Sequence, residues 1–315
     1  MQIVVIGGCG VLGQALLKAI VERGVLTRAD GVPVPVRRVI AVDRSQPARL
    51  FVEARVEYVR AEPGVPRVLQ AVMGVATDAV FHAWDAGAGA GRWTSSFALA
   101  DSLRDLLAVC AQQSSRPKVV LASSFAAVCR AETLAAEPQA RALPASQNGM
   151  TALVGELLLE EARRNGGIDG RALRLPMVAG APGCAGFLGA LVPALREGRA
   201  ASCPIPLDAA MWLTSASAAA RALVHAHELA PAAWATIGVP NAPGRTLSVD
   251  SLVQALMRSG GRPVQAPGVV PDAPLSDEVA RHPHRAAADT ALTLGFEDAP
   301  DAEALAGELA AAGAQ

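Results

Sequence analysis

Two residue types that enzymes often use to move protons are scarce in this chain of 315 residues. It contains one tyrosine, Tyr58, and two lysines, Lys18 and Lys118, and the rest of its 28 lysines and arginines are arginine. Any mechanism that needs a tyrosine or a lysine therefore depends on one of these three residues.

The chain also lacks a surplus of charge and a long apolar segment. Its formal net charge is −1, whereas a dedicated nucleic-acid binder needs a basic surplus to contact phosphates. No run approaches the roughly 20 apolar residues of a membrane span, and Met1 leads directly into a short apolar stretch rather than a signal peptide. We therefore expect a cytoplasmic protein that binds neither nucleic acid nor membrane.

The spacing of cysteines and histidines gives no sign of disulfides or of a metal site. The five cysteines form no C-x-x-C pair, so reduced and mostly buried thiols are expected. His225 and His227 lie two apart on a predicted helix and point to different faces, while His282 and His284 flank Pro283 in a predicted loop. These spacings predict no bound metal. The cysteines are Cys9, Cys110, Cys129, Cys184 and Cys203.

Short β-branched runs alternate with amphipathic stretches along the first half of the chain. This alternation predicts a parallel sheet covered on both faces, with right-handed crossovers. The predicted fold is therefore α/β, a Rossmann-like doubly wound parallel sheet with a smaller C-terminal substrate lobe. The expected strands are Ile3–Ile6, Arg38–Asp43, Val56–Val59, Ala79–His82, Lys118–Leu121 and Arg171–Leu175, and the expected helices are Val11–Arg23, Thr94–Gln112, Asn148–Arg164, Ser215–Glu228, Val249–Ser259 and Asp301–Ala312.

Proline and glycine become frequent beyond Pro176 and divide the chain into shorter elements. We expect residues 1–176 to form a dinucleotide-binding Rossmann domain, to which residues 207–240 return. Residues 177–315 are expected to form mainly the smaller substrate-binding lobe. The stretch 27–37, with Asp30-Gly31 and two prolines, is predicted to be an exposed loop.

A glycine-rich turn follows the first predicted strand and opens the first helix. In the sequence from Gly7 to Gly13, Gly7 permits a tight turn, Gly10 leaves room for a pyrophosphate, and Gly13 lets the helix pack closely on the sheet. The free N–H groups and the positive dipole end of that helix favour phosphate. The alternative is a glycine-rich connection without a ligand.

Asp43 ends the second expected strand, where a carboxylate can accept hydrogen bonds from ribose hydroxyls. A carboxylate there repels a 2′-phosphate, so NAD is favoured over NADP, although the adjacent Arg44 weakens that preference. Cys9 lies in the turn itself, where a helix amino terminus can lower the pKa of a thiol. The alternative role for Cys9 is that of a small residue filling a tight turn.

These features together resemble the extended short-chain dehydrogenase/reductases, the NAD-dependent epimerase/dehydratase family. The resemblance includes the G-x-x-G-x-x-G turn, Asp43, the Val80-Phe81-His82 strand and Ser123-Ser124, and it extends over nearly the whole chain. The segments Asp169–Pro176 and Cys203–Pro206 look most like the D-erythronate dehydrogenase branch. The resemblance and the turn together give the expected cofactor-binding residues Gly7, Cys9, Gly10, Val11, Leu12, Gly13, Asp43, Arg44, His82 and Ala83.

The chain departs from this family at the catalytic pair. The family transfers a hydride with the help of a Tyr-x-x-x-Lys pair at the start of the long helix and a serine after the fifth strand. Ser124 matches that serine, but the tyrosine position falls on Asn148 and the lysine position on Ala152. An amide does not ionise in the working range, so proton transfer by the family's route is absent. Ser124 either binds a substrate oxygen or only caps local backbone.

Other residues around the expected cleft differ from the family pattern as well. Trp84-Asp85 stands where small residues usually line the cofactor, and Leu99 stands where an asparagine is expected. A substitute acid or base would be Asp85, His82, or a water held by Ser124 and Asn148. Arg174 either pairs with a substrate carboxylate through its bidentate fork or ties the sixth strand to the lobe.

Two hypotheses about function remain open from the sequence. The first is an NAD-dependent oxidoreductase acting on a small hydroxy acid of the sugar-acid kind. The second is a catalytically inactive protein that binds a dinucleotide or a metabolite. A homodimer formed through the helices Thr94–Gln112 and Asn148–Arg164 is also expected, because both carry broad apolar faces.

Overall fold

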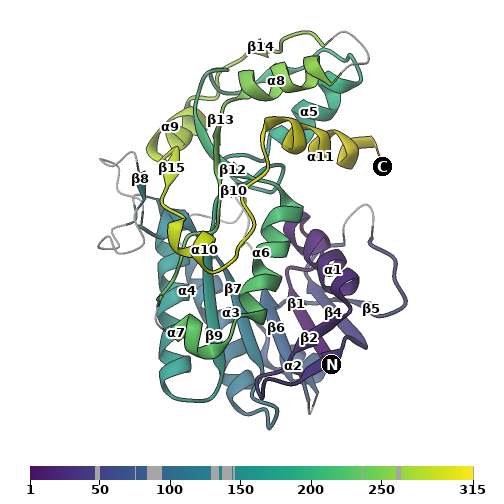
Figure 1. Ribbon diagram of the computed structural model, residues 1–315, viewed down its shortest axis with the longest axis vertical. Helices are drawn as coiled ribbons and strands as arrows, with labels where there is room; N and C mark the ends of the chain where they lie inside the picture. Colours follow the sequence, from purple (N-terminus) through teal and green to yellow (C-terminus); the bar gives the residue numbers. More distant parts are fainter. Residues whose placement is uncertain are drawn as a thin grey trace.

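The computed structural model (Figure 1) describes most of the chain. The described residues are 1–46, 50–74, 76–83, 94–128, 135–136, 144, 146–235, 237–259 and 264–314. The N-terminus begins the central sheet, and the C-terminus ends helix α11 in a second group of elements at the other end of the molecule.

The core of the molecule is a parallel sheet of six strands in the order β5-β4-β1-β6-β7-β9. The central strands β4, β1, β6 and β7 are rich in buried apolar residues, and neighbouring strands pair in parallel register, as Ile3 does with Val39 and with Ala79. The predicted doubly wound α/β fold is confirmed. The strands are β1 (Gln2–Ile6), β4 (Arg38–Asp43), β5 (Val56–Arg60), β6 (Ala79–His82), β7 (Lys118–Ser124) and β9 (Asp169–Leu175).

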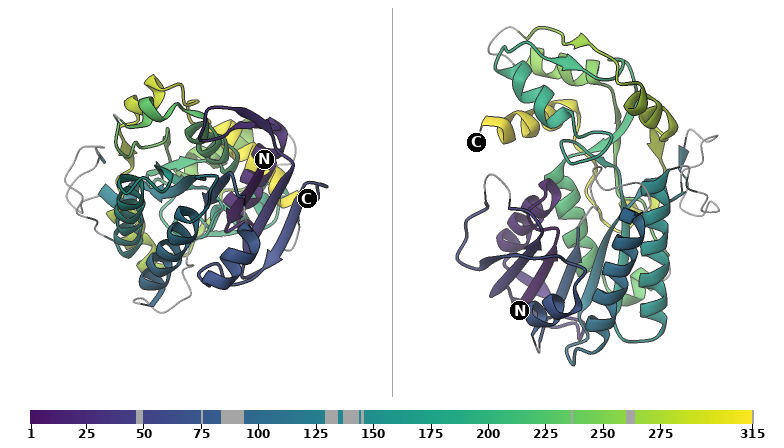
Figure 2. Two further views of the ribbon diagram at one scale, coloured as in Figure 1. Left: turned by 90° about the horizontal axis from the view of Figure 1, so that it is seen from below. Right: turned by 180° about the vertical axis from the view of Figure 1, so that it is seen from behind.

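Helices cover both faces of this sheet, as the view from below shows (Figure 2). Ile3 and Val5 face one side with α1 and α6, whereas Val4 and Ile6 face the other side with α2, α3 and α4. Successive residues of a strand point to opposite faces, so both sets of side chains are buried. The helices are α1 (Val11–Arg23), α2 (Pro66–Met73), α3 (Thr94–Ala111), α4 (Gln147–Arg164) and α6 (Ala216–Glu228).

A second hydrophobic core lies above the sheet in Figure 1. It joins Leu191 of α5, Leu252 of α8 and Leu305 of α11 to strand β12, which pairs with β10 and β13. The elements of this region are β10 (Met177–Val178), α5 (Leu188–Arg196), β12 (Met211–Thr214), β13 (Arg245–Leu247), α8 (Val249–Arg258), α9 (Ala273–Arg281), β15 (Arg285–Ala286) and α11 (Ala302–Ala314).

The segment predicted as an exposed loop at 27–37 contains regular structure, so that prediction was wrong in part. Strands β2 (Val25–Thr27) and β3 (Pro33–Pro35) pair antiparallel as a short hairpin. The Arg28 N–H closes the turn of this hairpin by donating to the Val32 carbonyl at 2.9 Å. Gly31, within the turn, has φ +82°. The sequence predicted the turn correctly. It did not predict the two short strands beside it, because proline is uncommon in strands and β3 contains two.

Within the described residues, no helix is both long and apolar enough to cross a membrane.

Candidate active site

A cleft of about 730 Å³ opens at the carboxyl ends of the sheet strands. Parallel α/β sheets bind ligands at this edge, because the loops that leave the strands meet there. The sheet side contributes the turn after β1 and the ends of β4, β6 and β7, together with the start of α4. The lobe side contributes residues 181–185 and His282.

The glycine turn has the shape that a diphosphate needs. Gly7 has φ +80°, which favours glycine, and a Cβ on Gly13 would lie 2.0 Å from the Gly7 carbonyl oxygen. Gly10 precedes α1 without a side-chain cap, so the first N–H groups of the helix have no side-chain acceptor there. Gly7, Gly10, Val11 and Leu12 line the cleft. This cradle fits the diphosphate of a dinucleotide.

Gly8 has a role in this turn that sequence analysis missed. A Cβ on Gly8 would lie 2.6 Å from the Cβ of Ala41 on β4. The turn therefore lies directly against the neighbouring strand, and only glycine allows that approach. The signal in the sequence was the doublet Gly7-Gly8, which was explained by Gly7 alone.

The Cys9 thiol is not activated. Burial, together with the nearby Asp43 carboxylate, raises the pKa of Cys9 to about 11. The Cys9 backbone N–H donates to Asp43 Oδ2 at 3.1 Å. A thiol with a raised pKa stays protonated, so the reactive-thiol alternative is wrong and Cys9 fills the turn.

Asp43 links the two loops at the turn end of the cleft. While Oδ2 accepts from Cys9, Oδ1 accepts from the backbone N–H and the hydroxyl of Ser45 at 3.1 and 3.2 Å. The side chain also lines the cleft, together with Arg44 and Arg60. The Arg60 Nε donates to the Arg44 carbonyl at 3.2 Å. This end of the cleft therefore holds one carboxylate and two guanidinium groups.

The degenerate catalytic positions meet in the same cleft. Ser124, Asn148 and Ala152 all line it. Ser146 caps α4 by accepting from the Gly149 N–H at 3.1 Å, and a Cβ on Gly149 would lie 2.3 Å from the Ala126 carbonyl oxygen. This close approach places the first turn of α4 beside the segment that follows β7, so the family's serine shares the cleft with an amide and a methyl group.

The tyrosine and both lysines lie elsewhere. The Tyr58 hydroxyl donates to the Phe51 carbonyl at 2.9 Å, and Lys18 forms an exposed pair with Glu22 at 3.8 Å. Lys118 is buried at the amino end of β7, where its Nζ donates to the His227 carbonyl at 3.1 Å. All three residues are described, and none of them lines the cleft. No tyrosine or lysine therefore replaces the missing pair.

His82 and Ala83 lie at the end of β6 and line the cleft as expected. His82 is 2% exposed, and burial lowers its pKa to about 4. Its imidazole is therefore neutral near pH 7 and a weak base. Trp84 and Asp85 lie outside the described residues, as does the side chain of Leu99.

Arg174 does not face the cleft, so the prediction that it binds a substrate carboxylate was wrong. Its Nε and Nη2 donate to Glu156 of α4 at 2.9 and 2.7 Å, and both side chains are buried. Ser123 donates to the same carboxylate at 2.5 Å. A buried guanidinium needs such a partner, and here the pair joins α4 to β9. The alternative role expected from the sequence was structural, but with the lobe as the partner of this strand, whereas the observed partner is α4.

The lobe contributes two side chains that sequence analysis left without a function. His282 and Cys184 line the cleft, and the His282 Nδ1 lies 3.9 Å from the Cys184 sulfur. Burial, with the nearby Glu278, raises the pKa of the Cys184 thiol far above its usual value. The thiol is therefore protonated.

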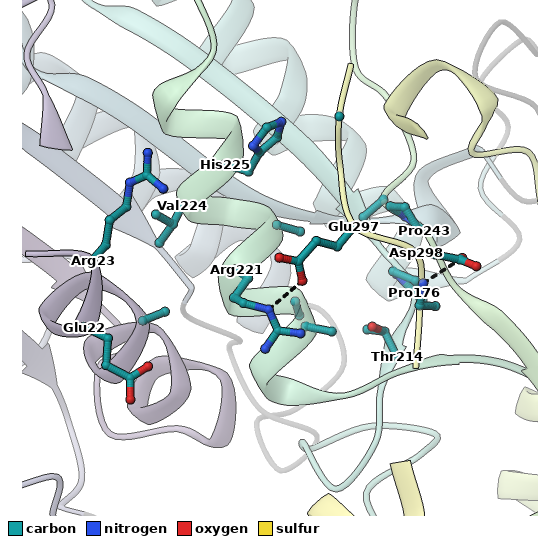
Figure 3. A pocket seen from close by; sticks show the side chains of 17 residues that line it. Glu22, Arg23, Pro176, Thr214, Arg221, Val224, His225, Pro243, Glu297 and Asp298 are labelled. Carbon is teal, nitrogen blue, oxygen red and sulfur yellow. Dashed lines mark hydrogen bonds and ion pairs between the residues drawn. The ribbon is translucent and has the colours of Figure 1, made fainter. Parts of the chain in front are cut away.

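A second cavity of about 390 Å³ lies between α1, α6 and residues 295–299 (Figure 3). Its arginines are committed to ion pairs: Arg221 with Glu297 at 2.8 Å, and Arg23 with Glu228 at 3.2 Å. His225 is held by the Leu294 carbonyl, with 2.9 Å between Nε2 and the oxygen. Its polar groups serve packing between α1, α6 and the C-terminal segment.

Metal ligation has no support in the described ranges, where no three His, Cys, Asp or Glu side chains gather closely enough to hold an ion.

The chain belongs to the NAD dependent epimerase/dehydratase family, whose sequence model matches residues 3–249. Within that class, it is 32% identical over 309 residues to a D-erythronate dehydrogenase from Cupriavidus necator, covering 94% of each chain. It is 25% identical over 316 residues to the D-erythronate dehydrogenase of Haemophilus influenzae, covering 94% of this chain and 95% of that one. The family resemblance inferred from the motifs is confirmed.

Solved structures share the fold. A nucleoside-diphosphate-sugar epimerase from Agrobacterium tumefaciens superposes with a TM-score of 0.83 at 23% identity, covering 97% of this chain and 92% of that one. The holo form of an L-threonine dehydrogenase from Cupriavidus necator superposes with a TM-score of 0.81 at 18% identity, covering 99% of each chain. A nicotinamide dinucleotide is therefore the cofactor that the family implies.

Proposed function

We propose that this protein is an NAD-dependent oxidoreductase that oxidises a small hydroxy acid of the sugar-acid class. The observation that carries this proposal is the diphosphate-shaped turn, which opens into the same cleft as Ser124 and Asn148. The two D-erythronate dehydrogenases among its relatives support the substrate class.

In this proposal the cofactor lies along the cleft from the turn to the end of β7. The backbone of Gly10, Val11 and Leu12 holds the diphosphate, and Asp43 accepts hydrogen bonds from the adenosine ribose. A carboxylate at this position disfavours a 2′-phosphate, which supports NAD rather than NADP. His82 and Ala83 form the wall under the nicotinamide half. When bound, the nicotinamide supplies the acceptor for a substrate hydride.

The substrate binds at the other end of the cleft, between α4 and the lobe. The Ser124 Oγ accepts from the Ala126 N–H at 3.2 Å, which is the local backbone contact expected as the alternative, and a hydroxyl that accepts one hydrogen bond can still donate its proton to a substrate oxygen. The Asn148 amide offers a donor and an acceptor in place of a phenol. Without the family's ionisable pair, these groups orient the substrate and do not take up its proton.

An inactive binding protein is the alternative that Asn148 and Ala152 favour. This alternative requires the same cofactor site as the oxidoreductase and predicts that NAD binds without turnover. A positioned acid or base contributes about 10²–10⁴-fold in rate, so even a slow dehydrogenase is distinguishable from a protein with no activity.

We also propose the division into a 1–176 domain, joined by residues 207–240, and a lobe formed mainly by 177–315. The two separate hydrophobic cores support this division, as does the packing of α6 on the sheet. A homodimer through α3 and α4 is supported by Met150 and Leu157 of α4, which are 49% and 61% exposed. The free thiols of Cys110 and Cys203 fit the reducing cytoplasm.

The function is tested by following absorbance at 340 nm while the protein is incubated with NAD and each four-carbon sugar acid, D-erythronate first. The proposal predicts cofactor reduction that depends on both the protein and the acid. NAD binding without reduction by any of the acids would instead favour the inactive binding protein.

A further inference from the structure

An oxidation in this cleft leaves one proton without an assigned acceptor. The alcohol loses a hydride from carbon and a proton from oxygen, and Ser124 and Asn148 do not accept a proton near neutral pH. Asp43 could accept one, but it lies at the turn end of the cleft and is engaged by Cys9 and Ser45. Among the described residues, a base must therefore come from another part of the cleft.

We propose that His282, supplied by the C-terminal lobe, accepts the proton of the substrate hydroxyl and returns it in the reverse reaction. This inference rests on the proposed oxidoreductase function. It assigns to an imidazole on the lobe the role that the family gives to a tyrosine on the long helix.

The His282 ring lies close to the end of β7, where Ser124 is. His282 lines the cleft, and its ring centroid lies 5.8 Å from that of Phe125, the residue after Ser124. The segment after His282 is tied to the same region, because β15 pairs with β8 (Ala135–Ala136) at Arg285 and Ala135. Figures 1 and 2 show α9 and β15 beyond the upper end of α4.

A hydrogen bond at Nδ1 fixes the tautomer of the neutral His282 ring. Pro283 disfavours helical geometry at the residue before it, and His282 leaves α9 with φ −86° and ψ 138°. Its ring folds back so that Nδ1 lies 2.7 Å from the carbonyl oxygen of Glu278, in the last turn of α9. A carbonyl only accepts hydrogen bonds, so Nδ1 carries the proton of the neutral ring. Nε2 is then the basic atom.

The other ionisable groups in the described part of the cleft are poorer proton acceptors. His82 has a pKa of about 4, because it is buried, and is a weak base for an alcohol proton. Cys184 holds its own proton, because burial and Glu278 raise its pKa. His282 is half-buried, so a proton taken up on Nε2 has a route to solvent.

The step balances in atoms and charge. The C–H bond of the secondary alcohol breaks and its hydride passes to oxidised NAD, which becomes NADH. The O–H bond breaks and its proton forms the new N–H bond at His282 Nε2, while the alcohol becomes a carbonyl. The imidazolium then releases the proton to solvent and is ready for another turnover.

The charged surroundings of the ring decide how its protonation depends on pH. Within the described part, Cys184 faces the ring from residues 181–185, the backbone carbonyl of Glu278 contacts it from α9, and the Glu278 carboxylate lies near the Cys184 thiol. Phe125, from the 3₁₀ turn after β7, is apolar. The flanking Arg281 and Arg285 are exposed to solvent. Protonation at low pH removes the base, so kcat/KM rises with pH through one ionisation.

The test compares His282→Gln with His284→Gln, a matched control two residues away that does not line the cleft. We expect His282→Gln to lower kcat by about 10²–10⁴-fold and to remove the ionisation from the kcat/KM profile. Its NAD affinity should equal that of the wild type. His284→Gln should keep the wild-type rate and profile.

A second measurement does not depend on turnover. The His282 ring signals are assigned by NMR from their loss in His282→Gln, and D-erythronate is added to the protein with NADH, a pair that cannot react. We expect these signals to shift. An unshifted ring, or a His282→Gln variant with the wild-type kcat and pH profile, overturns the assignment of His282. A wild type without turnover on any four-carbon sugar acid overturns the proposed function itself.

Discussion

The two ends of the central sheet use charge in opposite ways. At the amino end, Lys118 and Arg171 are buried and donate to backbone carbonyls at the end of α6, and Arg171 also pairs with Asp169 at 2.7 Å. His227 lies in the same cluster, with its Nδ1 2.8 Å from Glu228. These cations satisfy helix carbonyls that would otherwise lack partners.

At the carboxyl end, the cleft contains backbone amides and neutral polar groups where the family has a tyrosine and a lysine. Its turn depends on glycines, and Ser124 lines it together with Asn148 and Ala152. The comparison teaches that the buried lysine of this chain stabilises the fold and is unavailable for chemistry. Ligand binding and stability should therefore respond to different substitutions.

The largest effect on stability is expected at the amino end. Arg171→Met leaves Asp169 without its partner and removes a donor from three carbonyls at the end of α6, of which only that of His227 keeps Lys118 as a donor. Breaking a buried pair of this kind costs about 3–5 kcal/mol of unfolding free energy. Urea denaturation measures the loss. Arg164→Met, at a side chain 72% exposed, should change stability by no more than about 0.5 kcal/mol.

The next effect is a pH dependence of stability that comes from His82. Burial lowers its folded pKa to about 4, so below pH 6.5 the unfolded chain binds a proton that the folded chain does not. Stability is complete above pH 6.5 and falls by about 3 kcal/mol as the pH drops to 4. His82→Gln should flatten this part of the curve in urea denaturation at several pH values.

A residual slope of the same sign is expected in His82→Gln, because burial also lowers the pKa of His227. An unchanged pH dependence in the variant would contradict the burial of His82.

Gly10→Val should weaken dinucleotide binding without unfolding the protein. A Cβ on Gly10 meets only the Gly7 carbonyl oxygen, at an ordinary 3.5 Å, and its φ of −72° suits any residue. The added methyl groups occupy the place of the diphosphate, so we expect about 100-fold weaker NADH binding, or about 2.7 kcal/mol. NADH fluorescence titration measures it. Gly8→Val should instead destabilise the fold, because its Cβ would lie 2.6 Å from Ala41.

The smallest predicted effect is an increase in kcat. Restoring the family pair with Asn148→Tyr and Ala152→Lys should raise kcat with D-erythronate by about tenfold, because an ionisable pair returns beside Ser124. The initial rate of NADH formation checks this. A double variant that folds, binds NAD and is no faster would show that the site no longer fits the family's mechanism.

The sheet, its covering helices and the glycine turn were predictable because their signals are local. The periodicity of Val11–Arg23 and the strand Arg38–Asp43 gave the observed bounds. The missed features depend on distant partners: Arg174 is held by Glu156, and His282 by Glu278 and Phe125. No periodicity encodes such pairings, and α9 (Ala273–Arg281) was hidden by the prolines around it.

The most direct test of the comparison is isothermal titration of NAD into the wild-type protein and into Gly10→Val. The account predicts one binding site per chain in the wild type, with an affinity that falls sharply in the variant. It is contradicted if the wild type takes up no NAD at millimolar concentration, or if both proteins bind it equally well.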